Sequence, residues 1–392
     1  MMMRKPKNRW LWATMGGAFV LIAIACAPIV RGQLAGRTVD GRMIALNRKA
    51  PDFPPPGFQV SGTTWINSAP LTLKDLRGKV VMIDFWEYTC INCIRTFPQN
   101  KEWYARYHKY GFEIIGVHDP EFQIAYDVDN VRAAVKRYGL PYPIVVDDYF
   151  KIWKAYGNNV WPNRFLIDAN GNLRYELEGE GDDHNFEVVI RQLLDEAHPG
   201  LTFPADYTLP PAENPDAPGC GGEPTPEMYV GPWEGRGILE NHDPYHPGST
   251  VNYKLPDKVD DGHAVVSGKW ETDPNGMIFE GKSQQPSPKA SRMKMRYHAT
   301  QVYAVMNVAQ GKPERLYILQ DGQDLTNDNK GADVKTDGNG HSYIDVDSSR
   351  MYYLTANKTF GSHTLELIPT EPGLEVDSFT FGNSCQTNFP HE

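Results

Sequence analysis

The sequence predicts two folded domains, an α/β domain followed by an all-β domain. In residues 51–197, apolar runs typical of buried strands alternate with helical patterns. Residues 225–392 instead carry short β-like runs that turn residues separate. Eight prolines between Pro199 and Pro226 mark a stiff linker, residues 198–224, which divides the two domains.

The N-terminal segment predicts export of the chain. Trp10–Val30 is a run of 21 uncharged, mostly apolar residues behind a basic N-terminus. Such a run can span a bilayer, so residues 1–36 are predicted to be a signal peptide or a signal-anchor helix, with residues 37–50 as a linker. A lipid on Cys26 is a third alternative, because small residues precede this cysteine. In all three cases the positive-inside rule places everything after Arg31 outside the cytoplasm, on the periplasmic side of the membrane or secreted.

The charge of the chain argues against nucleic acid as a partner. The net charge is −10, and no cluster of basic residues follows the N-terminal segment. Export from the reducing cytoplasm permits disulfide chemistry, so the five cysteines are candidates for it.

Two cysteines at a strand-to-helix junction form the centre of the predicted site. The apolar run Val80–Phe85 leads to Cys90 and Cys93, and a helical pattern follows. Because the N-terminus of a helix favours negative charge, Cys90 is expected to ionise below the usual thiol pKa of about 8.5 and to attack disulfides. Cys93 lies one turn further on, where it can resolve a mixed disulfide. This redox-active disulfide would serve without any added cofactor.

A metal site is the weaker interpretation of the same pair. A structural zinc site needs four ligands, and no second Cys-X-X-Cys or Cys-X-X-His follows at ribbon or finger spacing. The Asp- and Asn-rich stretch Asp324–Asp333 also lacks the glycine and glutamate positions of a Ca²⁺ loop. We therefore predict no bound metal.

An acidic residue in the strand before the cysteines is a candidate base. Asp84 lies in an otherwise apolar run, where desolvation should raise its pKa and let it act as a base near neutral pH. A structural Asp at the end of a strand is the alternative.

The stretch from Asp84 to Pro98 reads Asp-Phe-Trp-Glu-Tyr-Thr-Cys-Ile-Asn-Cys-Ile-Arg-Thr-Phe-Pro and resembles the active-site segment of thioredoxin-fold proteins, in particular the TlpA-like group. The resemblance implies a central mixed sheet flanked by helices, in which Asp84 accepts the proton of Cys93. It also implies a cis-proline at Pro162, next to the cysteine pair, that shapes a groove for an extended substrate. Trp161 would flank this groove or pack in the core.

Further stretches are similar to the DipZ-like branch of these proteins. In Gly116–Phe122, which reads Gly-Val-His-Asp-Pro-Glu-Phe, Glu121 would either tune the cysteine pair or lie in solvent. Glu87 is a departure from the family, because Thr or Ala is usual at its place, and its charge would oppose thiolate formation at Cys90. Three C-terminal segments resemble the jelly roll of galactose-binding type that DipZ-like proteins carry: Thr225–Gly231, Gly331–Val334 and Phe379–Gly382.

A peroxiredoxin-like antioxidant is a minor alternative for the same fold. Ile83 and Glu87 stand where the peroxiredoxin pattern has its Pro and Thr, so the pattern is missing.

The C-terminal region is predicted to be a β-sandwich. Its expected strands are residues 302–308, 315–319, 342–346, 351–354, 364–368 and 378–381. Four aromatic residues could stack on sugars, although core packing is the favoured interpretation: Trp233, Trp270, Tyr297 and Tyr303. Cys220 and Cys385 flank the sandwich and are candidates for a structural disulfide, with buried free thiols as the alternative.

These observations predict an extracytoplasmic thiol-disulfide oxidoreductase. Its partners would be protein disulfides or dithiols, including those of cytochrome c maturation, and a separate membrane electron donor or acceptor. The alternative, from another functional class, is a glycan- or envelope-binding protein whose cysteine pair is regulatory.

Overall fold

The computed structural model describes residues 43–52, 65–207, 221–232, 237–241, 246–283, 285–308 and 312–384. The predicted export segment with Cys26, the aromatic Trp233 and the predicted Cys220–Cys385 pair lie outside these residues. Within them, every helix is too short or too polar to cross a bilayer.

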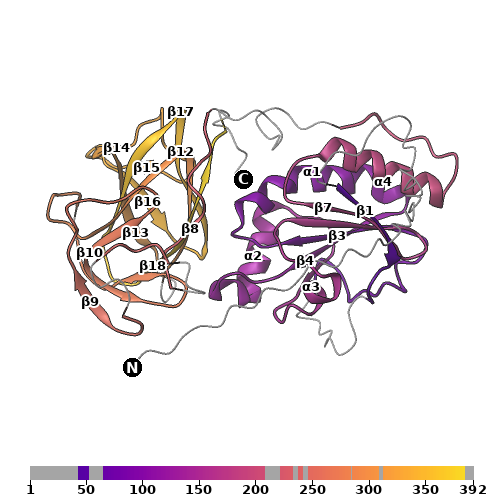
Figure 1. Cartoon of the computed structure of the whole chain (residues 1–392), viewed down its shortest axis with the longest axis horizontal. Coiled ribbons are helices and arrows are strands. Elements are labelled where there is room, and N and C mark those ends of the chain that lie inside the picture. Colours follow the sequence, from indigo (N-terminus) through magenta and orange to yellow (C-terminus); the bar gives the residue numbers. More distant parts are fainter. Residues whose placement is uncertain are drawn as a thin grey trace, which may run out of the picture. The chain divides into compact units, whose positions relative to one another are not determined.

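The first domain is a seven-stranded mixed sheet with helices on both faces (Figure 1), as predicted for the α/β domain. Along the sheet the strands follow the order β1-β7-β6-β3-β4-β5-β2, which puts β3 at the centre, parallel to β4 and antiparallel to β6. The strands are β1 (Met43–Lys49), β2 (Trp65–Ile66), β3 (Val80–Trp86), β4 (Phe112–His118), β5 (Ile144–Val146), β6 (Asn163–Ile167) and β7 (Asn172–Glu178). The helices are α1 (Ile91–Tyr107), η1 (His108–Tyr110), η2 (Gln123–Tyr126), α2 (Val128–Tyr138), α3 (Lys151–Tyr156) and α4 (Asp183–Ala197).

The alternation of side chains along β3 decides which residues lie beneath the cysteines. Phe85 points to α3, where its ring is 5.7 Å from that of Tyr156. Its neighbour Trp86 points to the other face, where its ring is 5.3 Å from that of Phe97 in α1. Because side chains alternate across a strand, Asp84 lies on the same face as Trp86. Figure 1 shows α1 and α4 on this face and α3 on the other.

The turn between β6 and β7 is longer than the sequence indicated. Asn170 and Gly171 predict a two-residue hairpin loop, whereas the strands are joined by the four residues 168–171. The carboxylate of Asp168 explains the difference, because it accepts the backbone N–H groups of Asn170 and Asn172 at 3.0 and 2.9 Å. This side chain holds a wider turn than an Asn-Gly pair alone would form.

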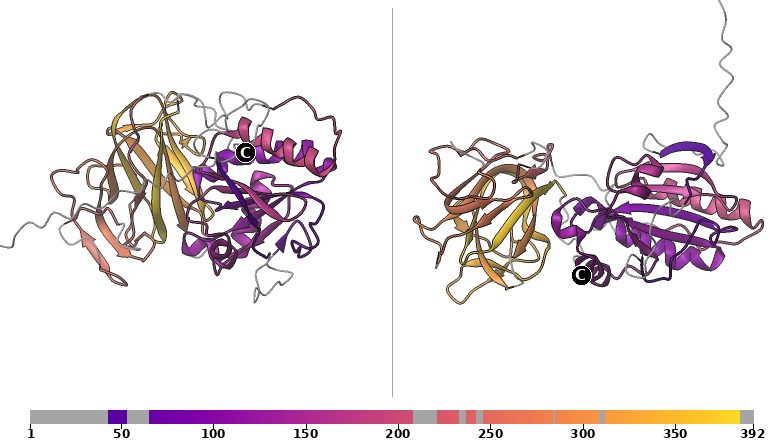
Figure 2. Two further views of the ribbon diagram at one scale, coloured as in Figure 1. Left: turned by 45° about the vertical axis from the view of Figure 1, so that its right-hand side comes forward. Right: turned by 90° about the horizontal axis from the view of Figure 1, so that it is seen from below.

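The C-terminal domain is all-β, as predicted, and its described residues form strands and turns without a helix (Figure 2). Its strands follow the order β15-β16-β13-β17-β12-β10-β11-β18-β8 along the sheet. In addition, β14 pairs with β13, and β9 pairs with β10. The strands are β8 (Met228–Tyr229), β9 (Thr250–Tyr253), β10 (Ala264–Thr272), β11 (Met277–Phe279), β12 (Arg292–Val308), β13 (Glu314–Gln320), β14 (Gln323–Asp324), β15 (Lys335–Thr336), β16 (Ser342–Val346), β17 (Arg350–Pro369) and β18 (Leu374–Gly382).

Two of the predicted strands are parts of one. Residues 351–354 and 364–368 both belong to β17, which pairs with β12 along most of its length. The residues between them are mostly half-buried or exposed, so they lack the apolar alternation from which a strand is predicted. Residues 355–356 and 361–363 nevertheless pair with β12, on either side of an irregularity in the register, so the strand continues.

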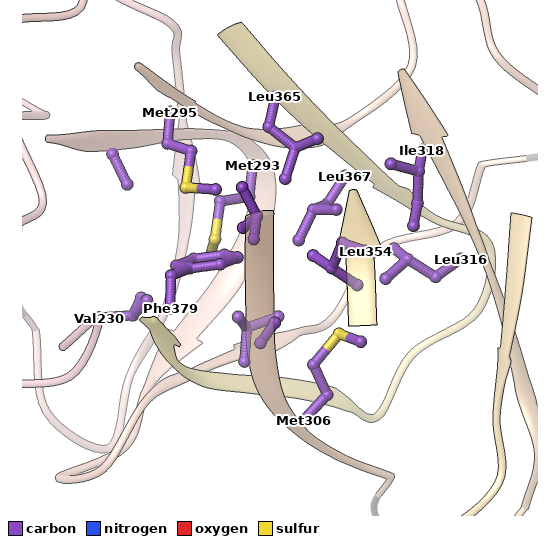
Figure 3. Close-up of a cluster of buried hydrophobic side chains, with 14 of the residues drawn as sticks. Val230, Met293, Met295, Met306, Leu316, Ile318, Leu354, Leu365, Leu367 and Phe379 are labelled. Atoms are coloured by element: carbon purple, nitrogen blue, oxygen red, sulfur yellow. The ribbon is translucent and has the colours of Figure 1, made fainter. Parts of the chain in front are cut away.

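The core of this domain is formed by apolar side chains of facing strands (Figure 3). Met293 and Met295 of β12 lie opposite Leu367 and Leu365 of β17 in the antiparallel register. The aromatic residues for which sugar stacking was the alternative, where the structure describes them, are also buried, since Trp270, Tyr297 and Tyr303 are each 0% exposed. Core packing is therefore the correct interpretation of these three aromatics.

Candidate functional site

The cysteine pair lies at the junction of β3 and α1, on the face of the sheet that α1 covers. Cys90 is the N-cap of α1, with extended backbone angles, and its sulfur accepts a hydrogen bond from the backbone N–H of Cys93 at 3.3 Å. The two Sγ atoms are 2.6 Å apart, and both residues are free cysteines. Cys90 is half-buried whereas Cys93 is 0% exposed, so a large substrate can reach Cys90 first.

The expectation that Cys90 ionises easily is wrong. Burial raises the pKa of its thiol, and the negative charges of Glu121 and Glu87 raise it further, although hydrogen bonds with Cys93 act in the opposite direction. Burial likewise raises the pKa of Cys93 well above its usual value, and the neighbouring Cys90 and Asp84 add to this effect. The helix N-terminus provides a hydrogen bond to the sulfur, but desolvation outweighs it.

Asp84 lies in the interior on the same side of the sheet as α1. It is 0% exposed, and its Oδ2 atom accepts a hydrogen bond from Asn100 Nδ2 at 2.9 Å, while Oδ1 has no hydrogen-bond partner among the described residues. Burial raises the pKa of Asp84 to about 7, the direction expected for a carboxyl in an apolar strand; Arg164 and Asn100 partly oppose the shift. A carboxyl with this pKa can take up and release a proton near neutral pH.

Two residues around Asp84 were not predicted from the sequence. Arg164 lies opposite Asp84 in the β3–β6 register, is fully buried, and forms a salt bridge with Asp183 at 2.8 Å. Its guanidinium also stacks over the ring of Trp103 at 5.6 Å. Asn100 is brought to Asp84 by α1. Arg164 in particular could have been noticed, because a charged residue two positions after Pro162 in an apolar strand needs a buried partner.

The structure places Pro162 immediately before β6, the neighbour of β3. The peptide bond between Trp161 and Pro162 is cis, as the resemblance to thioredoxin-fold proteins implied. Trp161 is half-buried and its ring lies 4.5 Å from the ring of Trp153 in α3. One side of Trp161 therefore packs against the core, and the rest of its side chain is partly exposed.

The two predicted tuning residues, Glu87 and Glu121, lie in different environments. Glu87 is 0% exposed, and its Oε2 atom accepts hydrogen bonds from the backbone N–H and the Oγ1–H of Thr89, at 2.6 and 2.5 Å. Glu121 is half-buried in the segment after β4, and its Oε1 atom accepts a hydrogen bond from Tyr229 at 2.6 Å. Neither carboxylate is a freely solvated loop residue.

The fold and the site together define a class of protein: a thioredoxin-fold domain with a Cys-X-X-Cys pair, joined to an all-β domain. Residues 46–176 match the model of the AhpC/TSA family, and residues 225–382 match the model of the thioredoxin like C-terminal domain. Within the first match, Ile83 and Glu87 occupy the Pro and Thr places of the peroxiredoxin pattern, so the chain lacks that pattern.

The predicted resemblance to DipZ-like proteins is confirmed. The chain is 34% identical to Protein DipZ of Mycobacterium tuberculosis over 327 residues, which are 82% of this chain and 42% of DipZ. It therefore spans about two fifths of the length of that relative. It is also 28% identical to the thiol-disulfide oxidoreductase ResA of Bacillus thuringiensis, over 48% of this chain and 98% of ResA. A putative thiol:disulfide interchange protein DsbE from Chlorobium tepidum has 26% identity and a TM-score of 0.33, covering 38% of this chain and 96% of that one.

Proposed function

We propose that this chain is an extracytoplasmic thiol-disulfide oxidoreductase that acts on protein disulfides through Cys90 and Cys93. The observation that carries the proposal is the arrangement of the two sulfurs, 2.6 Å apart at the N-terminus of α1, with one reachable and one buried. The name of one relative, the thiol-disulfide oxidoreductase ResA, supports it. Because the chain covers only part of DipZ, the activity is inferred from the site of this chain itself.

In the first half of the reaction, the thiolate of Cys90 attacks one sulfur of a substrate disulfide. A Cys90–substrate disulfide forms, the substrate disulfide breaks, and the second substrate sulfur leaves as a thiolate that takes up a proton. Cys90 is the attacking sulfur because it is the more exposed of the pair. Pro162, adjacent to β3, would shape the groove in which the substrate lies, with Trp161 at its side.

In the second half, Cys93 attacks the sulfur of Cys90 and releases the substrate as a second thiol. The proton of Cys93 passes to Asp84, whose pKa of about 7 suits a base at neutral pH. The substrate disulfide has then gained two electrons and the Cys90–Cys93 pair has lost two, as a disulfide. Separate electron donors must reduce this disulfide before the next turnover.

The proposed location and partners rest on the sequence. The apolar segment Trp10–Val30 would export the chain and, if retained, anchor it beside a membrane electron donor. Substrates would be exported proteins with disulfides, including cysteine pairs that must be reduced for cytochrome c maturation. We assign residues 51–197 to the redox domain and residues 225–392 to a jelly-roll module. No carbohydrate partner is proposed, because the three described aromatics that suggested one are buried.

The proposal is tested by trapping substrates with the full chain. A Cys93→Ala variant should retain exported proteins as mixed disulfides through Cys90, which are released by dithiothreitol and identified by mass spectrometry. The control is the double variant Cys90→Ala, Cys93→Ala, which should retain none. Equal recovery by the two variants from an extract rich in disulfide proteins would contradict the proposal.

A further inference from the structure

A buried carboxylate and a buried imidazole lie next to each other at the base of the loop that carries Cys90. The Oε1 atom of Glu87 is 3.8 Å from Nε2 of His118, and both side chains are 0% exposed. Glu87 directly follows β3, and His118 is the last residue of β4, opposite Trp86 in the parallel register. The central pair of strands therefore brings the two groups together beside the cysteines.

Each group lacks a hydrogen-bond partner on the side that faces the other. The two ring nitrogens of His118 form no hydrogen bond with the described residues, and neither does the Oε1 atom of Glu87. The other oxygen of Glu87 accepts two hydrogen bonds from Thr89, which stabilise the ionised carboxylate. Buried polar groups without partners are rare, because each loses its hydration and gains no hydrogen bond in return. A proton on Nε2 of His118 would give the Oε1 atom of Glu87 a partner of opposite charge at 3.8 Å.

The surroundings of His118 hold its ring in place toward the carboxylate. The ring stacks on Tyr88 with centroids 5.8 Å apart, and it meets Trp86 edge-on at 5.0 Å. The other ionisable groups nearby are acidic: Asp119 follows His118 directly, the backbone of Asp147 bonds to the His118 carbonyl at 2.8 Å, and Asp148 interacts electrostatically with the imidazole. His118 is thus a basic group among acidic neighbours.

We propose that Glu87 and His118 form a buried carboxylate–imidazolium pair, and that His118, as a positioning residue, neutralises Glu87 so that Cys90 can ionise for attack. The proposal rests on the proposed function only in that it gives the attacking role to Cys90. Glu87 is the buried carboxylate next to the Cys90 loop, and His118 supplies the compensating charge. The charges of Glu87 and Glu121 each oppose the thiolate of Cys90, and a charge on His118 would offset that of Glu87.

The experiment is a double-mutant cycle on the full-length reduced protein. His118→Phe keeps an aromatic ring against Trp86 and Tyr88 but removes the charge. Glu87→Gln keeps the size of the side chain and an oxygen for Thr89 but removes the carboxylate. The rate of alkylation of Cys90 by iodoacetamide is followed from pH 6 to 10 by mass spectrometry, which separates this cysteine from the others.

We expect His118→Phe to slow alkylation of Cys90 at pH 7 about tenfold, the effect of one charge on the thiolate fraction. Glu87→Gln should accelerate alkylation, and adding His118→Phe to it should change the rate less than about twofold. The exposed His184→Phe in α4 is the matched control and should leave the rate unchanged. A second measurement, the equilibrium of the pair with glutathione, should show a more stable disulfide in His118→Phe than in the natural protein.

The cycle also gives the results that would overturn the proposal. If His118→Phe slows alkylation of Cys90 equally in the natural protein and in Glu87→Gln, His118 does not act through Glu87. The same holds if His118→Phe leaves the rate in the natural protein unchanged. Should His118→Phe fold poorly, His118→Gln provides the same comparison with a polar side chain. Alkylation of Cys90 needs no substrate protein, so its outcome is independent of whether the trapping experiment succeeds.

Discussion

Replacing Asp84 by Asn should make the stability of the first domain less dependent on pH. Asp84 is buried between β3 and α1, where its pKa is raised from 3.8 to about 7 by burial. Asn has nearly the same shape and can still accept the hydrogen bond from Asn100 Nδ2. The substitution therefore removes the ionisation with little change in packing.

The raised pKa of Asp84 makes the folded domain less stable as the pH rises. Between pH 4 and pH 7 the folded domain keeps a proton on Asp84 that the unfolded chain has lost, so stability falls as the pH rises through this window. The difference between a pKa of 3.8 and one of about 7 corresponds to about 4 kcal/mol of unfolding free energy. The natural domain loses all of this stability only above pH 7. Asp84→Asn should thus be more stable than the natural domain by up to about 4 kcal/mol at pH 8, and nearly equal to it at pH 4.

Hydrogen exchange read by mass spectrometry measures this effect in the full chain. Peptides from β3 and β4 report the opening of the first domain separately from the C-terminal domain. The control is Asp129→Asn, because the Asp129 side chain is 93% exposed and should give no such pH-dependent gain. Equal stabilisation by Asp84→Asn at pH 4 and pH 8 would refute the reasoning, since it would show that the ionisation of Asp84 is not what destabilises the domain.

Two further predictions concern the neighbours of Asp84. Arg164→Met should raise the pKa of Asp84 further, because the charge of Arg164 lowers it, and the pH midpoint found in the exchange experiment should move upward; an unchanged midpoint would contradict this. Gly116→Ala would place a Cβ atom 2.9 Å from Nε1 of Trp86, so it should destabilise the domain by about 1–3 kcal/mol in thermal unfolding, and a variant as stable as the natural protein would contradict this.

Local patterns predicted most of the redox domain because its elements are set by neighbouring residues. The run Val80–Phe85 forms β3, Gly139 ends α2 in the left-handed region as a helix-ending glycine should, and residues 144–146 form β5. The turn at residues 168–171 was predicted, but its length was wrong, because the side chain of Asp168 and not the Gly sets it. The long strand β17 was predicted as two strands because its middle lacks the apolar alternation of a strand, and residues 357–360 also fall outside the register with β12.

The electrostatics of the site could not be predicted in the same way. The helix N-terminus suggested a low pKa for Cys90, but that effect is local, whereas burial and the charges of Glu87 and Glu121 arise from residues that the fold brings together. The same holds for Arg164 and Asn100, which reach Asp84 from another strand and from two turns along α1. A sequence shows which groups can ionise, but their neighbours across strands decide whether they do.

The charges around the cysteines bear on the direction in which electrons flow. A thiolate at Cys90 is opposed by burial and by the charge of Glu121, and the pKa of Cys93 is raised as well, so the reduced pair gains little stability from ionisation. In strongly oxidising proteins of this fold the opposite holds, since a stabilised thiolate makes their disulfide ready to accept electrons. We therefore infer that Cys90 and Cys93 donate electrons to their substrates, with a potential nearer the thioredoxin value of about −270 mV than the DsbA value of about −120 mV. Equilibration of the full chain with glutathione measures this potential, and a value close to −120 mV would show that the negative surroundings of Cys90 do not govern the couple.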